Sequence, residues 1–456
     1  MQATLQKYSY AFFVCLIFGI SFLLFSSIRY PLLNSDNAVT VLMTHYFKMP
    51  NDLYFWGQDR LGSLIPLLGQ IPNKLFGLSP LLSESIVHYL ILLLGYLSFS
   101  TFIRSNFYKI IFATIWFLPP MRLIDVTQFA FGIHYSLIGI VCFLIDRLDK
   151  SNVSEKPLKY YLTFTLVALL TITAIWVSDM AIVSAGLLIA INFYYFQKGK
   201  DSKNLRNRNS LLAFSLAGII IGVVFIKYAK SFSSMQNSYS TFGEPEMIMK
   251  SVSIFSKTIS DFLTFKTNDP GTSIFTYFAL ALITMVFLSI KNFRADERTK
   301  KWVLYFILES IILFGIILAS KWTFLNSVPR RYFTCTYITL SFALILIIDN
   351  LDLTNKRKSL LKTLSLITVI SGFLSSVYYL RFEEPKSLTP MVTVLDDFKS
   401  LGKIGVISEY WNSYVTSCID PVNIKATPHD QTYAVRNMKI VEEVFEQPNI
   451  YIIRDM

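Results

Sequence analysis

Apolar runs of about the length of a membrane-spanning helix recur along this 456-residue chain and constrain its fold class more than any other feature. Charged residues make up only 16% of the sequence, whereas soluble domains contain roughly 25%. The first run lacks a small-residue cleavage pattern, so we expect it to remain as an anchor. The third run is short and ends at Pro119-Pro120, which leaves open whether it spans. The runs lie near residues 8–28, 83–103, 110–120, 130–146, 160–176, 180–196, 210–228, 274–290, 303–320, 332–348 and 363–380. We therefore predict an all-α polytopic membrane protein with about 11 transmembrane helices.

Lysine and arginine residues are distributed unequally between the segments that join these runs. If the N-terminus lies inside, the short inner segments carry 21 of them and the longer outer loops before the tail carry 12. This is the positive-inside bias, and it predicts an inside N-terminus and an outside C-terminus. It also accounts for the net charge of +12, so we expect no nucleic-acid partner.

The long polar segments all fall on the predicted outer side. A first outer loop covers about residues 29–82, and a later one, about 229–273, contains an amphipathic segment. We expect residues 1–385 to form a transmembrane catalytic module and residues 386–456 a small extracytoplasmic α/β tail. Long polar segments at one membrane surface favour an enzyme that acts at this surface over a transporter, because the irregular elements of a transporter lie near the bilayer midplane.

The tail shows alternating strand and helix patterns, and the cysteines show no pairing pattern. Three of the four cysteines lie in apolar runs and Cys418 is alone in the tail, so we expect no structural disulfide. The predicted tail strands cover residues 403–408, 422–427 and 449–455, and the predicted helices cover 388–402 and 433–445.

The first outer loop contains two amphipathic pieces. The first runs from Asp36 to Lys48, and its pattern predicts a helix whose apolar side lies in the headgroup boundary. Asp commonly caps helix N-termini, and this is the ordinary interpretation of Asp36. The second piece covers residues 63–76, where the interior prolines Pro66 and Pro72 should bend or break a helix.

Several short motifs together resemble one family. They comprise Asp36 with the helix that follows it, Gly57-Gln58-Asp59-Arg60-Leu61-Gly62-Ser63, Phe76-Gly77-Leu78-Ser79-Pro80, Arg330-Arg331-Tyr332-Phe333 and Glu409-Tyr410-Trp411-Asn412-Ser413-Tyr414. Their order and topology resemble GT-C superfamily glycosyltransferases. The most similar group is the protein-mannosyltransferase-like enzymes that use polyprenyl-phosphate sugars.

This resemblance implies a membrane glycosyltransferase with Asp36 as the catalytic base. It implies a polyprenyl-phosphate-linked sugar as donor, a glycan, lipid or protein as acceptor, and action at the outer face of the cell membrane, among membrane lipids. The family commonly has an acidic pair at this point, but here Asn37 follows Asp36. A single carboxylate must then suffice, and a divalent metal remains only a candidate cofactor.

The chemistry of the donor is compatible with one carboxylate. Glycoside hydrolases need a second carboxyl group to protonate the departing oxygen, whereas a departing phosphate needs no such proton. One base for the acceptor hydroxyl and cations for the phosphate are sufficient, and the expected outcome is inversion at the sugar carbon.

Several cations on the outer side are candidates for binding the donor phosphate. Arg330 and Arg331 lie there against the positive-inside trend, and guanidinium binds phosphate in a two-pronged way. The alternative is that they anchor a helix end at the interface, as Arg and Tyr often do. The full set of phosphate-binding candidates is Arg330, Arg331, Tyr332, Lys321, Arg60 and Arg122.

Other polar residues of the same compartment are candidates for binding the sugar or the acceptor, because polar groups near membrane depth are costly and often functional. For Asp179, in a tight turn, the alternative is a turn cap. Glu309 lies inside the ninth run, and we interpret it as hydrogen-bonded to a neighbouring helix. The sugar- and acceptor-binding candidates are Asp59, Asp125, His134 and Asp179.

Two other functions are compatible with these patterns. The first is a polysaccharide ligase that uses a diphosphate-linked glycan. The second is a lipid or glycan transporter without chemistry, which would move a lipid-linked sugar across the membrane and leave its linkage unchanged.

Overall fold

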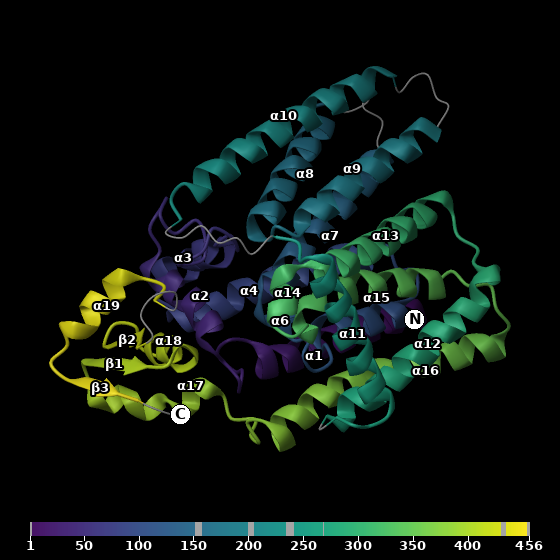
Figure 1. The fold of residues 1–456 in the computed structure, drawn as a ribbon. Helices are drawn as coiled ribbons and strands as arrows, with labels where there is room; N and C mark the ends of the chain where they lie inside the picture. Colours follow the sequence, from purple (N-terminus) through teal and green to yellow (C-terminus); the bar gives the residue numbers. More distant parts are fainter. Residues whose placement is uncertain are drawn as a thin grey trace.

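A computed structural model describes residues 2–150, 157–198, 205–233, 241–267, 269–429 and 435–453, and describes only the backbone of residues 2–7, 196–198 and 205–216. Parts of the predicted later outer loop (234–240 and 268) and of the predicted tail (430–434 and 454–456) therefore lie outside the described residues. Each apolar run forms a helix (Figure 1). These helices are α1 (Gln2–Phe25), α4 (Pro80–Ser100), α5 (Asn106–Phe117), α7 (Ala130–Asp149), α8 (Pro157–Val177), α9 (Ala181–Lys198), α10 (Leu205–Lys230), α12 (Pro270–Ser289), α13 (Glu297–Ala319), α15 (Thr334–Ile348) and α16 (Asn355–Tyr378).

Among the described residues, 8 helices are long and apolar enough to cross a membrane. The apolar part of α9 is shorter, and the first half of α10 lacks described side chains. Helix α5 has 12 residues and so extends about 18 Å at 1.5 Å per residue. That is less than the hydrocarbon core of about 30 Å, so the third run does not span on its own. The protein is nevertheless a multi-pass helical membrane protein, as predicted.

Ordinary capping residues start several of these helices. Ser79 accepts a hydrogen bond from the Leu82 N–H at the start of α4, and Pro80 follows it. Asp269 does the same for Thr272 N–H at the start of α12. A side-chain oxygen at the cap satisfies a backbone N–H that the helix leaves unpaired, and proline is well placed just after it.

An aromatic cluster holds α4, α5, α13 and α15 together at the centre of the molecule. Its members are almost fully buried, and the ring centroids of Phe99 and Phe342 are 4.7 Å apart. Edge-to-face and tilted contacts of this kind add to the stabilisation that burial provides. They keep the short helix α5 within the bundle. The cluster consists of Phe99, Phe112, Trp116, Phe306 and Phe342.

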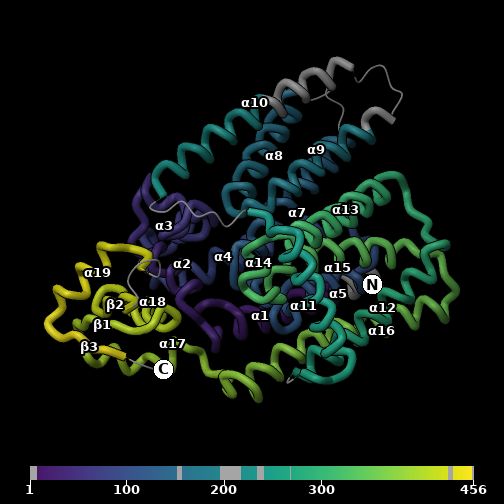
Figure 2. Tube along the Cα trace, viewed as in Figure 1, coloured from purple at the N-terminus to yellow at the C-terminus, as the bar shows by residue number. Residues whose placement is uncertain are grey.

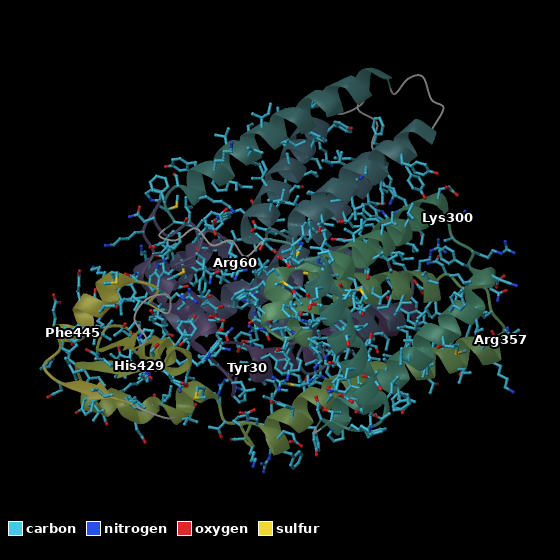
Figure 3. All side chains as sticks on the ribbon, viewed as in Figure 1. Tyr30, Arg60, Lys300, Arg357, His429 and Phe445 are labelled. Carbon is cyan, nitrogen blue, oxygen red and sulfur yellow. The ribbon has the colours of Figure 1, made fainter. Side chains whose placement is uncertain are left out.

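The segments predicted to lie on opposite sides of the membrane lie at opposite ends of the molecule. Figure 3 places Lys300 and Arg357, from predicted inner segments, at the right edge. His429 and Phe445 of the tail lie at the left edge, with Arg60 and Tyr30 between them and the centre. The two groups of loops therefore gather at separate ends, which is the arrangement expected from the charge pattern.

The first outer loop contains helices α2 (Ser35–Tyr46) and α3 (Leu64–Phe76). The apolar residues of α2 are fully buried against α3, α4 and the tail instead of facing lipid headgroups. The prediction that prolines interrupt α3 was wrong. Pro66 lies in the first helical turn, where its missing N–H costs nothing, and the helix continues through Pro72. Phe76 and its neighbours at the end of α3 are exposed.

Shorter elements complete the end of the molecule that carries the predicted outer loops, which we call the outer end. They are α6 (Asp125–Gln128), α11 (Pro245–Leu263), α14 (Lys321–Leu325), the 3₁₀ helix η3 (Arg330–Phe333) and the π-helical turn η4 (Tyr379–Glu383) that continues α16. Helix α11 is the amphipathic segment that the sequence predicts in the later outer loop.

The tail forms a small α/β unit beside α2 (Figures 1 and 2). Strands β1 (Ile404–Ser408), β2 (Ile424–Pro428) and β3 (Ile450–Ile452) make a parallel sheet in the order β2-β1-β3. Helices α17 (Met391–Val394), α18 (Tyr410–Cys418) and α19 (Met438–Phe445) accompany it, with the 3₁₀ helix η5 (Asp396–Leu401). The three predicted strands are confirmed within the described residues, whereas α18, the helix that packs on α2, was not predicted.

Candidate active site

Asp36 lies in the first turn of α2 but does not cap the helix. The side chain of Asn34 is the cap, and its Oδ1 accepts from the N–H groups of Asp36 and Asn37 at 3.0 and 3.3 Å. The carboxylate of Asp36 is therefore available for another partner. Its Oδ1 accepts a hydrogen bond from the hydroxyl of Tyr410, at 2.5 Å.

Tyr410, at the start of α18, connects Asp36 to an arginine of the tail. Nη2 and Nε of Arg436 donate to the Tyr410 hydroxyl at 3.1 and 3.3 Å, and the guanidinium lies 5.0 Å from the ring centroid. Burial and the Asp36 charge raise the pKa of Tyr410, whereas Arg436 opposes this. The hydroxyl therefore keeps its proton and donates a hydrogen bond to Asp36.

The loop of the first motif passes close to this arginine. Gly57 has a φ of +71°, and a Cβ at this position would lie 3.2 Å from Cδ of Arg436. Glycine adopts this backbone conformation without the steric cost that other residues meet, and it leaves room for the guanidinium. The Gly57 segment and the tail thus come together beside Asp36.

Further contacts fasten the tail to both ends of α2. The Ser35 hydroxyl donates to the Tyr410 carbonyl and accepts from the Tyr414 N–H at 3.2 Å. At the other end, Lys425 donates to the Tyr46 hydroxyl at 2.5 Å and pairs with Glu443 at 3.0 Å. The position of Tyr410 relative to Asp36 is therefore fixed by the docking of the whole tail.

Asp125 and Arg331 lie near Asp36 although they are far from it in the sequence. Asp125 begins α6, and Arg331 lies in η3 just before α15. Burial raises the pKa of Asp125 to about 6, a shift that Arg331 opposes and the Asp36 charge increases. Two carboxylates and one guanidinium thus interact at the outer end of the bundle. Tyr332 lies beside the same guanidinium, with its ring centroid 5.6 Å from Cζ of Arg331.

Asn37 has a structural partner that a carboxylate could not bind. Its side chain is buried, and Nδ2 donates to the backbone carbonyl of Gln128 at 3.0 Å. A carboxylate has no hydrogen to donate when it is ionised. The residue next to Asp36 therefore links α2 to the end of α6 and is not a second acid in the site.

Arg330 points away from Arg331 into a separate polar cavity of about 290 Å³. Nη2 of Arg330 is 3.5 Å from Oδ2 of Asp269. Arg122 also lines this cavity and donates to the Tyr379 hydroxyl at 2.7 Å. Arg122 has a φ of +67°, a backbone conformation that costs a non-glycine residue roughly 1–2 kcal/mol. The cavity also contains Glu383 and Glu384.

Asp59, Arg60 and Asp179 form another group at the outer end. Lys230, Asp59 and Arg60 are the charged neighbours of Asp179. Nε of Arg60 donates to Gln58 at 2.9 Å, and its guanidinium lies 6.0 Å from the Trp322 ring. The structure thus brings three predicted residues together, in a group that contains neither Asp36 nor Arg331.

Two predicted site residues lie elsewhere. Lys321 begins α14 with an exposed side chain, and its N–H donates to the Thr241 carbonyl at 3.1 Å. His134 is fully buried within α7 and does not line the cavity that contains Arg330. Its Nε2 is 3.3 Å from the Ser184 hydroxyl, which in turn donates to Glu309. Glu309 is hydrogen-bonded to neighbouring helices, as its interpretation from the sequence required.

The charge of Arg331 distinguishes the residues near Asp36 from a typical site for a divalent cation. Mg²⁺ is bound through one or two carboxylates with water and substrate phosphates, and Ca²⁺ takes six to eight oxygen ligands. The site supplies two carboxylates, and Arg331 interacts with both of them. Within the described ranges, no group of three or more His, Cys, Asp or Glu side chains could hold a metal. We therefore derive no reaction step through a metal.

Comparison of the sequence with protein-family models and with curated proteins gives no match. The fold is similar to that of ArnT from Cupriavidus metallidurans. The apo structure matches with a TM-score of 0.60 and 9% identity over 95% of this chain and 87% of that chain. The structure bound to undecaprenyl phosphate matches with a TM-score of 0.58 and 8% identity over 99% of this chain and 90% of that chain.

A second similar fold is that of the oligosaccharyltransferase from Archaeoglobus fulgidus. Its apo structure matches with a TM-score of 0.50 and 11% identity over 92% of this chain, but over only 64% of that chain. ArnT and this oligosaccharyltransferase are both GT-C glycosyltransferases. The chain therefore has the fold shared by ArnT and this oligosaccharyltransferase, which agrees with the fold that the resemblance of the sequence motifs implies.

Proposed function

We propose that this protein is a membrane glycosyltransferase that moves a sugar from a polyprenyl-phosphate donor to an acceptor hydroxyl. The observation that supports this most strongly is the convergence of Asp36, Asp125, Arg331 and Tyr410 at one place. These residues come from the first outer loop, the start of α6, the turn before α15 and the tail. A base, a phosphate-binding cation and a hydrogen bond that orients the base are the groups the reaction needs.

Asp36 acts as the general base in this proposal. The Tyr410 hydroxyl occupies Oδ1 of Asp36, so Oδ2 accepts the proton of the acceptor hydroxyl. The acceptor oxygen forms a bond to the anomeric carbon as the bond from that carbon to the phosphate oxygen breaks. The bonding electron pair leaves with the phosphate, the proton remains on Asp36, and the configuration at the anomeric carbon inverts.

Arg331 binds the donor phosphate in this proposal. Its guanidinium already interacts electrostatically with Asp125 and Asp36, so its positive charge acts on the proposed base. A positive charge held in place stabilises the negative charge that develops on the leaving phosphate. Asp125 positions Arg331 through its own negative charge.

The cavity of about 290 Å³ that contains Arg330 bears on the choice between monophosphate and diphosphate donors. Arg122 and Arg330 could bind a second phosphate, which would favour the polysaccharide ligase. However, the same cavity is lined by Asp269, Glu383 and Glu384, so its formal charge is negative. A second phosphate would meet this excess of carboxylates, and a monophosphate donor is therefore the better proposal.

The proposed reaction takes place at the outer face of the cell membrane. Support comes from the charge pattern, which predicts the outer side for every segment that contributes to the site. The complex of ArnT with undecaprenyl phosphate supports the choice of a polyprenyl-phosphate donor. The acceptor in this proposal is a glycan, lipid or protein that presents a hydroxyl at this surface.

The test is sugar transfer by purified full-length protein from a defined polyprenyl-phosphate sugar to a hydroxyl acceptor. Asp36→Asn should lower the transfer rate by about 10²–10⁴-fold, the usual contribution of a general base, and should leave donor binding intact. Asp397→Asn, at an exposed carboxylate of the tail, is the matched control. Full activity of Asp36→Asn would remove Asp36 as the base. Movement of the lipid across sealed vesicles with an unchanged sugar linkage would support a transporter.

A further inference from the structure

A smaller cavity, of about 50 Å³, is lined by Asn37 and Thr40 of α2. It is bounded by α2, α3, the first turns of α4 and the start of α7. Gln128, Ser63 and His88 line it with apolar residues such as Ile65 and Ile133. No residue assigned to phosphate binding or proton transfer lines this cavity.

The polar side chains of this cavity have buried atoms without hydrogen-bond partners among the described residues. These atoms are Oε1 and Nε2 of Gln128, Oγ of Ser63 and Nε2 of His88. The exposed fractions of the three residues are 9%, 3% and 5%, respectively. More than nine in ten buried polar groups in folded proteins are paired. Four unpaired atoms around one space therefore indicate that a polar ligand group fills it.

The three side chains are held firmly in place. Ser63 follows Gly62, whose N–H donates to the Trp176 carbonyl at 2.9 Å and which has no room for a Cβ against Trp176. The backbone carbonyl of Gln128 accepts from Asn37, the residue next to Asp36. The walls of the cavity are thus fixed relative to the proposed catalytic base.

The contact between His88 and Glu84 on α4 determines which nitrogen of His88 faces the cavity. Nδ1 of His88 is 3.5 Å from Oε1 of Glu84, and both residues are buried. The carboxylate favours a proton on Nδ1, so Nε2 can accept a hydrogen bond from a ligand. The nearby negative charge of Glu84 disfavours an anionic ligand group.

The size of the cavity limits what can enter. A cavity of about 150 Å³ holds a benzene molecule, which has six heavy atoms. The space here is about 50 Å³, which is too small for a hexose ring but sufficient for a substituent of a few heavy atoms.

We propose that this cavity binds the acetamido group of an N-acetylated sugar, an inference that rests on the proposed glycosyl transfer. The N–H and the carbonyl of an acetamido group point in opposite directions, so Nε2 of Gln128 can donate to its carbonyl while Nε2 of His88 accepts from its N–H. Ser63 is a further partner, and Ile65 and Ile133 provide apolar contacts for the methyl group. A hydroxyl in the same position would contact only one of these partners. An ammonium group would lack the apolar contact, and a carboxylate would be repelled by Glu84.

The acetamido group can belong to the donor sugar or to an acceptor sugar, and two pairs of substrates distinguish these sources. The donor pair is polyprenyl-phosphate N-acetylglucosamine and polyprenyl-phosphate glucose, tested with one acceptor. The acceptor pair is an N-acetylglucosaminide and the matching glucoside, tested with one donor. Each is assayed with full-length wild type, Gln128→Leu, Ser63→Ala and the control Gln447→Leu, whose side chain lies in the tail and donates to the Glu443 carbonyl.

We expect wild type to prefer the acetamido substrate by about 10-fold or more in kcat/KM in one arm, as two hydrogen bonds would provide. Gln128→Leu should reduce this preference to within about twofold, Ser63→Ala should weaken it, and Gln447→Leu should retain it. Size-exclusion chromatography and thermal unfolding of each variant report on folding. A preference that is equal in wild type and in folded Gln128→Leu, in both arms, would overturn the proposal.

Binding separates this inference from the proposed function. Equilibrium binding of N-acetylglucosamine 1-phosphate and glucose 1-phosphate, and of the two acceptor glycosides, is measured with the same proteins. Selective binding by wild type that Gln128→Leu abolishes would support the cavity even if no substrate were transferred, in which case only the proposed function would fail. Equal binding within each pair, with transfer intact, would overturn the cavity and leave the proposed function standing.

Discussion

Tyr410→Phe is the substitution that most directly tests the arrangement around Asp36. It removes one hydroxyl, which donates to Oδ1 of Asp36 at 2.5 Å and accepts from Arg436. The aromatic ring remains, as do the contacts of the Tyr410 backbone with Ser35. We therefore expect the tail to stay docked and only the orientation of the carboxylate to change.

The size of the effect follows from the type of hydrogen bond. A hydrogen bond to a charged group contributes about 1.5–3 kcal/mol, and 1.36 kcal/mol corresponds to a tenfold change in rate. If most of the bond of Tyr410 serves to hold Asp36 in its reactive position, kcat should fall by about 10- to 100-fold. KM for the donor should change little, because Arg331 and not Tyr410 holds the phosphate in the proposed mechanism.

Tyr46→Phe is a matched control for this measurement. Tyr46 also places its hydroxyl on the tail, where it donates to the Pro421 carbonyl at 3.0 Å and accepts from Lys425. It is ten residues from Asp36, which is about 15 Å along the helix. Loss of this hydroxyl should lower the unfolding temperature about as much as Tyr410→Phe does but should leave kcat near the wild-type value.

The assay is sugar transfer from a polyprenyl-phosphate donor at saturating and limiting concentrations, with thermal unfolding of each variant measured in parallel. A double-mutant cycle with Arg436→Met adds a second criterion. Because Arg436 acts on Asp36 through Tyr410, it should have little further effect on kcat once the hydroxyl is absent. The reasoning is refuted if Tyr410→Phe keeps wild-type kcat, or if Tyr46→Phe lowers kcat equally.

Three further predictions concern the surroundings of Asp36. Asn37→Asp should lower the free energy of unfolding by about 2–3 kcal/mol, because a buried carboxylate would face the Gln128 carbonyl without a proton to donate, and denaturant titration measures this. The pKa of Asp125 is raised to about 6, so the transfer rate should fall as the pH drops through this value and Asp125 loses its charge. Asp125→Asn should remove this acidic limb from the pH–rate profile. Since this pKa lies above that of an unfolded aspartate, the contribution of Asp125 to stability is present at low pH and is lost as the pH rises through about 6. Arg331→Gln should raise the donor KM by about 10-fold or more, whereas Arg330→Gln should raise it less and should act mainly on stability through loss of its pair with Asp269. Equal effects of the two arginine substitutions on KM would contradict the assignment of the phosphate to Arg331.

The helices of the membrane region could be predicted from hydropathy because each must bury or expose a continuous apolar surface over its whole length. The helix formed by the third run, α5, could not be assigned a depth in this way. Its 12 residues are held by aromatic packing with Phe99, Phe306 and Phe342, and contacts between distant segments leave no local signal. Hydropathy therefore predicted that the run is a helix but not how far it extends across the membrane.

The polar pattern of the first outer loop was informative, but its local interpretation was incomplete. An aspartate at the start of a helix is commonly the cap, yet Asn34, two residues earlier, has this role. The amphipathic pattern of α2 predicted a lipid-facing side because a sequence does not show which apolar partner covers a helix. Here the partner is α18, more than 360 residues further along the chain.

The arginine pair illustrates why neighbours in sequence need not share a site. Arg330 and Arg331 are consecutive in a 3₁₀ helix, where successive residues are rotated by about 120°. Arg331 therefore faces Asp125 and Asp36, whereas Arg330 faces Asp269. The sequence indicated that this turn carries cations to the outer side, but the backbone conformation decides which of them reaches the base.

The tail is the part of the site that the sequence least revealed. Residue 385 separates two compositions, yet the proposed active site crosses this boundary, because the hydroxyl that orients Asp36 belongs to Tyr410. A carboxylate on the first turn of a helix has several rotamers, and only a donor placed by another element selects one of them. Ser35 and Tyr46 fasten the tail on α2, and Arg436 holds the Tyr410 hydroxyl from within the tail. Docking of the tail and orientation of Asp36 are therefore one structural event. If the tail were folded but not docked, the membrane region would keep Arg331 and Asp36, but the carboxylate would lack the orientation that the reaction requires.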